Sequence, residues 1–198
     1  MSDNGAPVGP TAWDGSINDP WHGSKGVIFE GGARIPYLVY WKGVIKPQIY
    51  DKGVITLDAG ATAVAVAGGN PERDTTLDGV NLMPFLTKDM KSDPHPYIYQ
   101  RYMNTAAIIQ GKYKFMTHEN GEELLFDVSL QELCAYDPDK DLHEAYNLIS
   151  KKPEKANELR NQLAKWKNKL PVPHYEGGYH DSLVEFINQR WGFINKAN

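Results

Sequence analysis

The sequence predicts a mixed fold of helices and strands, in which a small antiparallel sheet in the second half of the chain is covered by one helix. Two observations carry this prediction. Asn120-Gly121 lies between the apolar runs 113–117 and 124–128, and Asn-Gly in that setting is the strongest short-range signal for a β-hairpin. Across Pro153–Leu170 the apolar residues step by three and four positions, which predicts a helix with one apolar face. That face consists of Ala156, Leu159, Leu163, Trp166 and Leu170.

The remaining elements are predicted from local composition. Aromatic and β-branched runs between turn residues are typical of strands, and they occur at 97–102, 106–110, 113–117, 124–128 and 133–136. In the first half, Tyr37–Trp41 is predicted as a buried strand and Val54–Leu57 as a short one. Asp58 is expected to cap a helix over 59–67 that ends at Gly68-Gly69. A helical turn interrupted by Pro84 is expected at 81–86, and a short helix at 183–191.

Composition excludes several classes of protein. The chain has 198 residues, a net charge of −4 and an ordinary globular composition, so no basic surface for nucleic acid is expected. The single cysteine, Cys134, rules out an internal disulfide and a cysteine-rich zinc site. No apolar run reaches the roughly 18 residues of a membrane helix. The N-terminal residues show no positively charged stretch followed by an apolar run, so a secretory signal is not expected.

Three features of the first 36 residues could bind a metal ion or an anion or form an ion pair. Asp3-Asn4 places a carboxylate and an amide oxygen side by side, and hard cations such as Ca²⁺ and Mg²⁺ prefer oxygen ligands. Lys25 is flanked by glycines in Gly23-Ser24-Lys25-Gly26, which lets its ammonium approach an oxyanion. Glu30 and Arg34 are spaced to pair with each other across Gly31-Gly32. Taken singly, each feature is more often a turn, a solvated lysine or a structural ion pair.

Taken in chain order, these three features resemble sequence motifs of the formylglycine-dependent sulfatases, which belong to the alkaline phosphatase superfamily. That family reads S-D-N-G, then G-x-K-G-x-x-x-E-G-G-x-R-x-P, and this chain matches at residues 2–5 and 23–36. Later matches to its L-D-G-x-S-L-x-P, G-x-Y-K-L and Y-D…D-P-x-E-x-x-N-L motifs fall at 77–84, 111–115 and 136–148. The resemblance covers about residues 2–170, and six blocks in the right order make it specific.

The resemblance implies a fold, a reaction and site residues. The fold would be the C-terminal part of an α/β, alkaline-phosphatase-like sandwich, with the small sheet packed against the C-terminal helix. Asp3 and Asn4 match two ligands of the family's Ca²⁺ (with Mg²⁺ as an alternative), and Lys25 matches the lysine that holds a sulfate oxygen. His22 stands where many relatives carry arginine, so a substrate contact is a secondary expectation beside a ring packed in the loop. The parent reaction is hydrolysis of a sulfate ester.

The chain departs from the family at the nucleophile. Formylglycine forms from Cys or Ser in C/S-x-P/A-x-R, and that motif is absent because Cys134 lies in Leu-Cys-Ala-Tyr-Asp. We therefore expect a C-terminal portion that is inactive alone. Two alternatives stay open: a phosphodiesterase or phosphonate hydrolase of the same superfamily, and a non-catalytic module that binds anions or completes a partner.

The resemblance also sets expectations for organisation. Residues 1–92 would be the remnant of the catalytic domain, 93–170 the sheet-and-helix subdomain, and 171–198 a tail. An exposed sheet edge would favour self-association or pairing with a missing N-terminal part. The natural substrate and the compartment are not set by the sequence, although the parent family suggests a periplasmic or secreted protein.

Overall fold

The computed structural model describes residues 1–7, 15–16, 18, 20–73, 76–88, 90–103, 105–118, 120–129 and 146–171. These residues form two compact units. One comprises Tyr37–Ile98 together with Met1, and the other joins Ser2–Pro36 to the residues from Tyr99 onward. The candidate site residues therefore group with the sheet and not with the segment that follows them.

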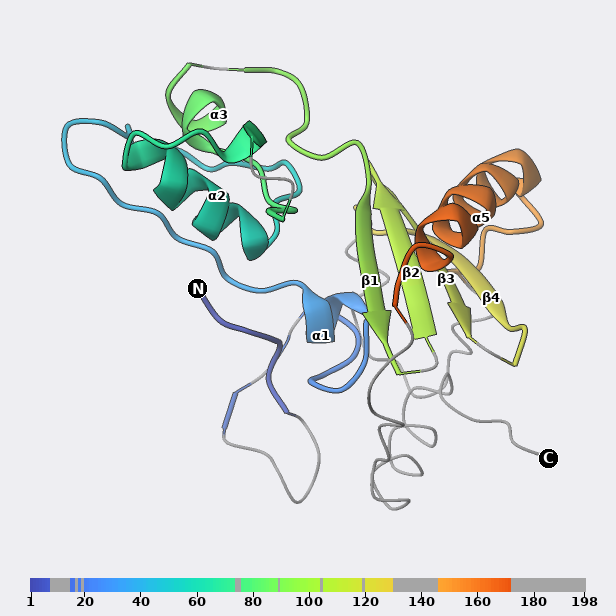
Figure 1. Ribbon diagram of the computed structural model, residues 1–198. Helices are drawn as coiled ribbons and strands as arrows, with labels where there is room; N and C mark the ends of the chain where they lie inside the picture. The colour runs from blue at the N-terminus through green and yellow to red at the C-terminus, as the bar shows by residue number, and fades with distance from the viewer. Residues whose placement is uncertain are drawn as a thin grey trace. The chain divides into compact units, whose positions relative to one another are not determined.

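A four-stranded sheet is the centre of the second unit, in the order β1-β2-β3-β4 (Figure 1). Its strands are β1 (Ile98–Tyr102), β2 (Thr105–Gln110), β3 (Tyr113–His118) and β4 (Glu123–Asp127). Strands β2 and β3 pair antiparallel, as do β3 and β4. The antiparallel sheet predicted from the hairpin signals is confirmed, with strand ends within a residue or two of those expected.

Glycines make the turns between β2 and β3 and between β3 and β4. Gly111 has φ +54° between β2 and β3, and Gly121 has φ +87° between β3 and β4. Residues with side chains rarely adopt such values. In the second turn the Asn120 side chain accepts a hydrogen bond from the Glu122 N–H at 2.9 Å, so Asn and Gly each have a distinct role in the predicted hairpin.

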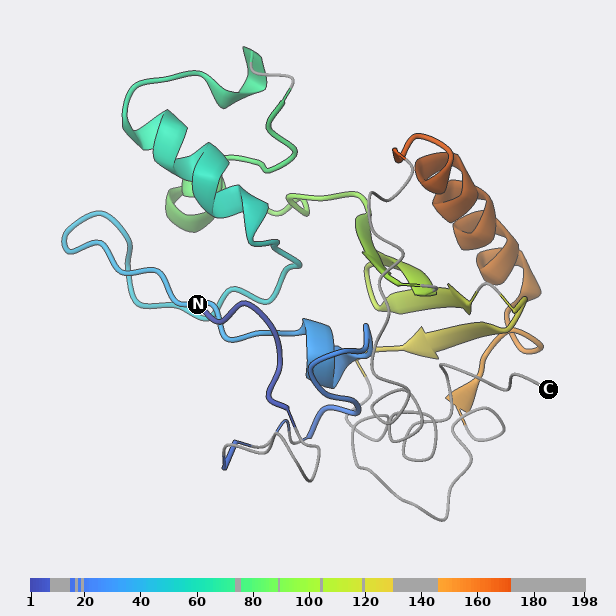
Figure 2. The same ribbon diagram turned by 60° about the horizontal axis from the view of Figure 1, so that its bottom comes forward.

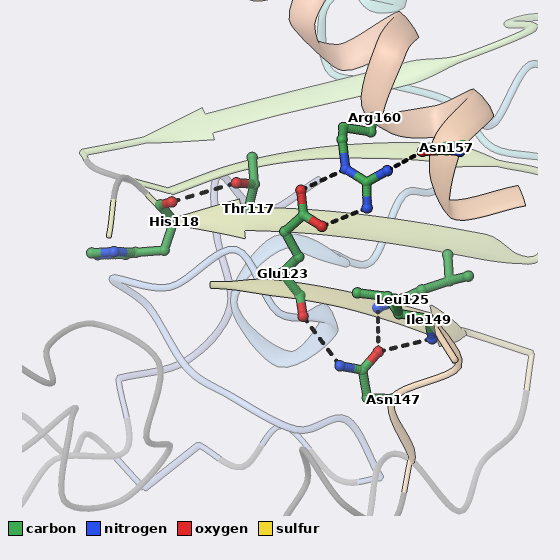
Figure 3. Close-up of polar contacts among 8 residues, drawn as sticks. All are labelled: Thr117, His118, Glu123, Leu125, Asn147, Ile149, Asn157 and Arg160. Atoms are coloured by element: carbon green, nitrogen blue, oxygen red, sulfur yellow. Dashed lines mark hydrogen bonds and ion pairs between the residues drawn. The ribbon is translucent and has the colours of Figure 1, made fainter. Parts of the chain in front are cut away.

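One face of the sheet is covered by α5 (Pro153–Lys167), which packs on β2 and β3 (Figure 1). Ala156, Leu159 and Leu163, three residues of the predicted apolar stripe, are buried there. A bidentate ion pair joins the helix to the sheet: Arg160 donates to the two carboxylate oxygens of Glu123 at 2.7 and 2.6 Å (Figure 3).

The loop segment that precedes and includes α1 (Glu30–Ala33) packs against the sheet's opposite face (Figure 2). Side chains alternate between the two faces of a strand, so residues 114 and 116 of β3 face this segment while 113 and 115 face α5. The shared core consists of Val27, Ile28, Phe29, Ala107, Met116, Leu124 and Phe126. The sheet thus holds the segment that carries the candidate site residues.

Asn147 closes the free edge of β4. Its amide accepts the Leu125 N–H and donates to the Glu123 carbonyl, both at 3.1 Å, and it also accepts the Ile149 N–H (Figure 3). The Leu148 N–H then donates to the Leu125 carbonyl at 2.8 Å. One side chain and one peptide group therefore satisfy backbone groups that a further strand would otherwise pair.

The first unit contains α2 (Leu57–Val66), a 3₁₀ turn at Pro71–Arg73 and α3 (Met83–Thr87). Asp58 organises it from a position that is 0% exposed. Its carboxylate accepts the backbone N–H of Ile55 and of Val80 at 2.8 and 2.9 Å, and His95 Nε2 lies 2.9 Å from it. The Asp78-Gly79 turn is thereby tied to the first turn of α2.

Three predictions for this unit are wrong in part. Tyr37–Trp41 forms no strand, because no neighbouring strand pairs with it among the described residues, and Leu38 and Tyr40 are 83% and 79% exposed. Val54–Leu57 leads into α2 instead of forming a strand. The helix predicted at 59–67 is confirmed, but its N-cap is Thr56, and Asp58 lies in the first turn.

Some expectations fall outside the described residues: the strand at 133–136, Cys134, the match at 136–144 and the helix at 183–191. None of the helices in the described ranges has the length and hydropathy that crossing a membrane would require.

Candidate functional site

The Asp3-Asn4 pair lies at a bend of the chain, and the residue that follows it is hydrogen-bonded to α1. The Gly5 N–H donates to the Gly32 carbonyl at 2.9 Å, and the Ser2 hydroxyl donates to the Asn4 carbonyl at 2.8 Å. Asp3 is exposed and Asn4 is half-buried. Within the described residues, neither side chain has a hydrogen-bond partner, so their oxygens are available to a ligand.

Lys25 lies at the tip of a tight loop. Gly23 and Gly26 on either side have φ +94° and +98°, which the glycines at these positions permit. The Val27 N–H closes the turn by donating to the Ser24 carbonyl at 3.2 Å. The Lys25 side chain is exposed, and no carboxylate of the described residues pairs with its ammonium.

The structure brings these two segments together through their backbones. The Lys25 N–H donates to the Ala6 carbonyl at 3.1 Å, so the lysine loop pairs with the chain two residues beyond Asn4. One backbone hydrogen bond therefore joins the loop of Lys25 to the segment of Asp3 and Asn4, although the two are far apart in the sequence.

Asn18 reinforces this junction, a role that its local sequence does not predict. Its amide accepts the Ala6 N–H at 2.8 Å and donates to the carbonyls of Ala6 and Gly23 at 3.0 and 3.1 Å. An Asn followed by Asp-Pro looks like an ordinary turn, so the only sequence signal was its position between the two motifs.

Three glycines let the backbones cross at close range. A Cβ on Gly5 would lie 1.7 Å from the Gly31 carbonyl oxygen, and one on Gly32 would lie 2.1 Å from the Val27 carbonyl oxygen. A Cβ on Gly31 would meet three carbonyl oxygens between 2.4 and 2.7 Å away. Each distance is far below van der Waals contact, so the Glu-Gly-Gly motif here is a requirement of backbone packing.

The predicted pairing of Glu30 with Arg34 is present but long, at 3.7 Å between Arg34 Nη1 and Glu30 Oε2. Arg34 also lies over the Trp21 ring at 4.0 Å from its centroid. A closer partner of Glu30 is Lys114 of β3, whose Nζ lies 2.8 Å from Glu30 Oε1. Local sequence patterns do not predict this contact because it joins residues 84 positions apart.

His22 is buried in the loop, with 7% of its surface exposed. Its ring packs edge-to-face against Phe29 at 4.9 Å between centroids. This is the loop-packed arrangement considered beside a substrate contact, and the substrate role of His22 stays a secondary prediction.

The donor set fits one part of a calcium site. A carboxylate and an amide oxygen are the right type for Ca²⁺, but the ion takes roughly six to eight oxygen ligands. In the part of the chain that the structure describes, no three His, Cys, Asp or Glu side chains cluster as a metal centre would require. Asp3 and Asn4 would hold such an ion only together with ligands from elsewhere.

Comparison with known proteins gives relatives of one kind. N-acetylgalactosamine-6-sulfatase of Mus musculus is 33% identical over 114 residues, covering 57% of this chain and 22% of that protein. Arylsulfatase A of Bos taurus is 32% identical over 152 residues, covering 68% and 30%. The uncharacterized sulfatase YdeN of Escherichia coli (strain K12) is 36% identical over 129 residues, covering 61% and 22%. No family model matches the chain.

Solved structures show the same fold. The crystal structure of Ps i-CgsB in complex with k-i-k-neocarrahexaose matches with a TM-score of 0.70 and 22% identity, over 97% of this chain and 40% of that one. The α/β arrangement described above is thus a fragment of a sulfatase fold.

Relatives and fold agree with the motifs, and the chain belongs to the sulfatase family of hydrolases. It spans between 20% and 30% of the length of the curated relatives it matches.

Proposed function

We propose that this chain supplies part of the site at which a sulfatase hydrolyses a sulfate ester. Asp3 and Asn4 would provide two oxygen ligands to Ca²⁺, and Lys25 would hold a sulfate oxygen. The observation that carries the proposal is the hydrogen bond from the Lys25 N–H to the Ala6 carbonyl. It fixes the lysine loop beside the Asp3-Asn4 segment, and all three side chains remain open to a ligand.

The chemistry of these residues suits the reaction. In ester hydrolysis the sulfuryl oxygens carry the charge that must be stabilised as the bond to the alcohol breaks. An ammonium placed by an ordered loop can neutralise one of those oxygens. Lys25 lies between Gly23 and Gly26, and Asn18 donates to the Gly23 carbonyl. A divalent cation bound at Asp3 and Asn4 would supply further charge stabilisation.

The isolated chain is proposed to be inactive. A family nucleophile made from C/S-x-P/A-x-R has no counterpart in its sequence, and two ligands cannot hold Ca²⁺ tightly. We expect no turnover of an aryl sulfate by the purified chain. Repeated turnovers that disappear in Lys25→Ala would overturn this part of the proposal.

Binding of Ca²⁺ tests the metal role directly. We would titrate the purified chain with Ca²⁺ and follow the backbone amide resonances of residues 3–5, because an incomplete site should bind only at about millimolar concentrations. The shifts should saturate in the wild-type chain and disappear in Asp3→Ala. The matched control Asp51→Ala removes another exposed carboxylate and should leave them unchanged.

Equal shifts in wild type and Asp3→Ala, or no shifts at residues 3–5, would refute the proposal that Asp3 is a metal ligand. Submicromolar binding that is lost in Asp3→Ala would mean that the site is completed within the purified material, for example across an oligomer. The aryl sulfate assay would then be repeated under those conditions.

The role of Lys25 has its own test. Inorganic sulfate should shift the amides of residues 24–26 in the wild-type chain and not in Lys25→Ala. Lys46→Ala, which removes another exposed lysine, is the control. The relatives described above are sulfatases, which favours sulfate over phosphate, and inorganic phosphate titrated in parallel compares the two anions.

A further inference from the structure

Lys114 is a charged side chain buried in the middle of the sheet. It is 1% exposed, and its neighbours in β3, Phe115 and Met116, are 0% exposed. Burying an ammonium is costly unless it is paired and hydrogen-bonded. An unbranched apolar side chain such as Met could fill the same space without this cost, so the charge requires an explanation other than packing.

Both contacts of the Lys114 ammonium lie in the segment on the other side of the core. Its Nζ donates to the Ile28 carbonyl and to Glu30 Oε1, the latter at 2.8 Å. Glu30 is itself only 15% exposed in its side chain. The lysine therefore binds the start of α1 through two hydrogen bonds, one to the backbone and one to a side chain.

The turn that Lys114 binds, residues 28–32, supports both parts of the candidate site. The Gly32 carbonyl receives the Gly5 N–H at 2.9 Å, which holds the Asp3-Asn4 segment. The Gly31 N–H donates to the His22 carbonyl at 2.7 Å, which holds the start of the Lys25 loop. A displacement of residues 28–32 would therefore move both segments.

We propose that Lys114 is a positioning residue, which through Ile28 and Glu30 fixes the turn that holds the segments of Asp3, Asn4 and Lys25. Its effect on segment order stands on the contacts alone, while its effect on ligand binding rests on the function proposed above. A salt bridge that served only general stability would act on the whole unit, whereas a positioning residue acts selectively on residues 2–7 and 21–33.

Hydrogen exchange of the full-length chain, read peptide by peptide, separates these two roles. In Lys114→Met we expect exchange in 2–7 and 21–33 to accelerate by about tenfold or more, as loss of a charge-assisted hydrogen bond would give. Peptides of β4 and α5 should keep their wild-type rates. Lys114→Arg retains the charge and should restore much of the protection.

Two further variants complete the set. Glu30→Gln keeps the shape of the partner and removes its charge, so it should reproduce a smaller form of the effect even if Lys114→Met does not fold. Arg160→Met breaks the ion pair on the opposite face of the sheet and should leave the exchange of 2–7 and 21–33 unchanged.

Unchanged exchange in 2–7 and 21–33 for both Lys114→Met and Glu30→Gln, or equal acceleration in all peptides, would overturn the proposal. The Ca²⁺ titration distinguishes it from the proposed function. Selective acceleration with no Ca²⁺ response at residues 3–5 in the wild type would support positioning and refute the metal role. A wild-type response that weakens in Lys114→Met and returns in Lys114→Arg would support both.

Discussion

At single positions, the candidate site contains glycines whose surroundings leave no room for a side chain. Gly31 shows this most clearly, because a Cβ there would lie 2.4 Å from the Gly23 carbonyl oxygen and 2.7 Å from those of His22 and Trp21. Gly60 in α2 is the opposite case, since a Cβ there would meet nothing within 4 Å. The same substitution at the two sites should therefore have opposite effects.

We expect Gly31→Ala to lower the free energy of unfolding by about 1–3 kcal/mol, because the carbonyls around it must move apart. Gly60→Ala should raise it by about 0.5–1 kcal/mol, since alanine restricts the unfolded chain and favours the helix. Urea denaturation of the two variants measures both. A Gly31→Ala chain as stable as the wild type would contradict the close backbone packing.

Asp127 makes stability depend on pH. Burial alone would raise the pKa of its carboxyl, but hydrogen bonds from Lys112 and Ser129 outweigh burial and hold the pKa below its ordinary value of 3.8. A depressed pKa in the folded state means that the contribution to stability is present above about pH 3.8 and is lost as pH falls through the lower, folded-state pKa.

Acid unfolding followed by circular dichroism checks this. The wild type should lose stability as pH is lowered below about 4, and part of that loss should be absent in Asp127→Asn. Asp78→Asn, at an exposed aspartate, is the matched control and should follow the wild type. Identical curves for wild type and Asp127→Asn would show that the Lys112–Asp127 pair contributes nothing measurable.

At the level of elements, the sequence predicts those whose signals are local. The hairpin turns contain Gly111 and Gly121 at positive φ, and the apolar stripe of α5 has a clear period, so these elements appear where expected. Tyr37–Trp41 fails because a strand needs a partner, and composition does not show whether one is present. Asp58 was assigned a cap by its position before a helix, whereas its bonds to Val80 and His95 are long-range.

The Asp58 carboxylate links three segments of the first unit, so its loss should affect all of them. We expect Asp58→Ala to cost about 1–3 kcal/mol of stability, because the partly buried N–H groups of Ile55 and Val80 lose their acceptor. Hydrogen exchange at those two amides should accelerate, while Arg73→Ala, at an exposed residue of the same unit, should have no such effect. Unchanged protection of both amides would refute this role.

At the level of the whole molecule, the resemblance located the motifs, and the spatial links between them could not be read from the sequence. Asn18 joins the two halves of the candidate site, and Lys114 supports them from residues 84–86 positions away. Neither residue type is unusual where it stands. Such contacts follow from the path of the backbone, which one sequence does not reveal.

The exposed segment 37–49 should govern the behaviour of the purified chain in solution. Its large apolar side chains include Leu38, Tyr40 and Ile49, the last 97% exposed, and exposed apolar patches favour association. We expect sedimentation velocity to show mass rising with concentration. The double variant Leu38→Glu/Tyr40→Glu should stay monomeric, and the control Lys46→Glu should not. A wild-type monomer at every concentration would refute this prediction.

The hydrogen bonds of the Asn147 amide affect how readily the folded chain aggregates. An open strand edge recruits further strands and can grow into fibrils, but beside Leu125 the groups that would recruit them are already occupied by one side chain and the peptide group after it. Asn147→Leu would free the Leu125 N–H and the Glu123 carbonyl, while the Leu148 N–H keeps its bond to the Leu125 carbonyl. Fibril growth in that variant, followed by dye fluorescence, would then start from β4, and a residue outside the candidate site would protect the chain from this route of aggregation.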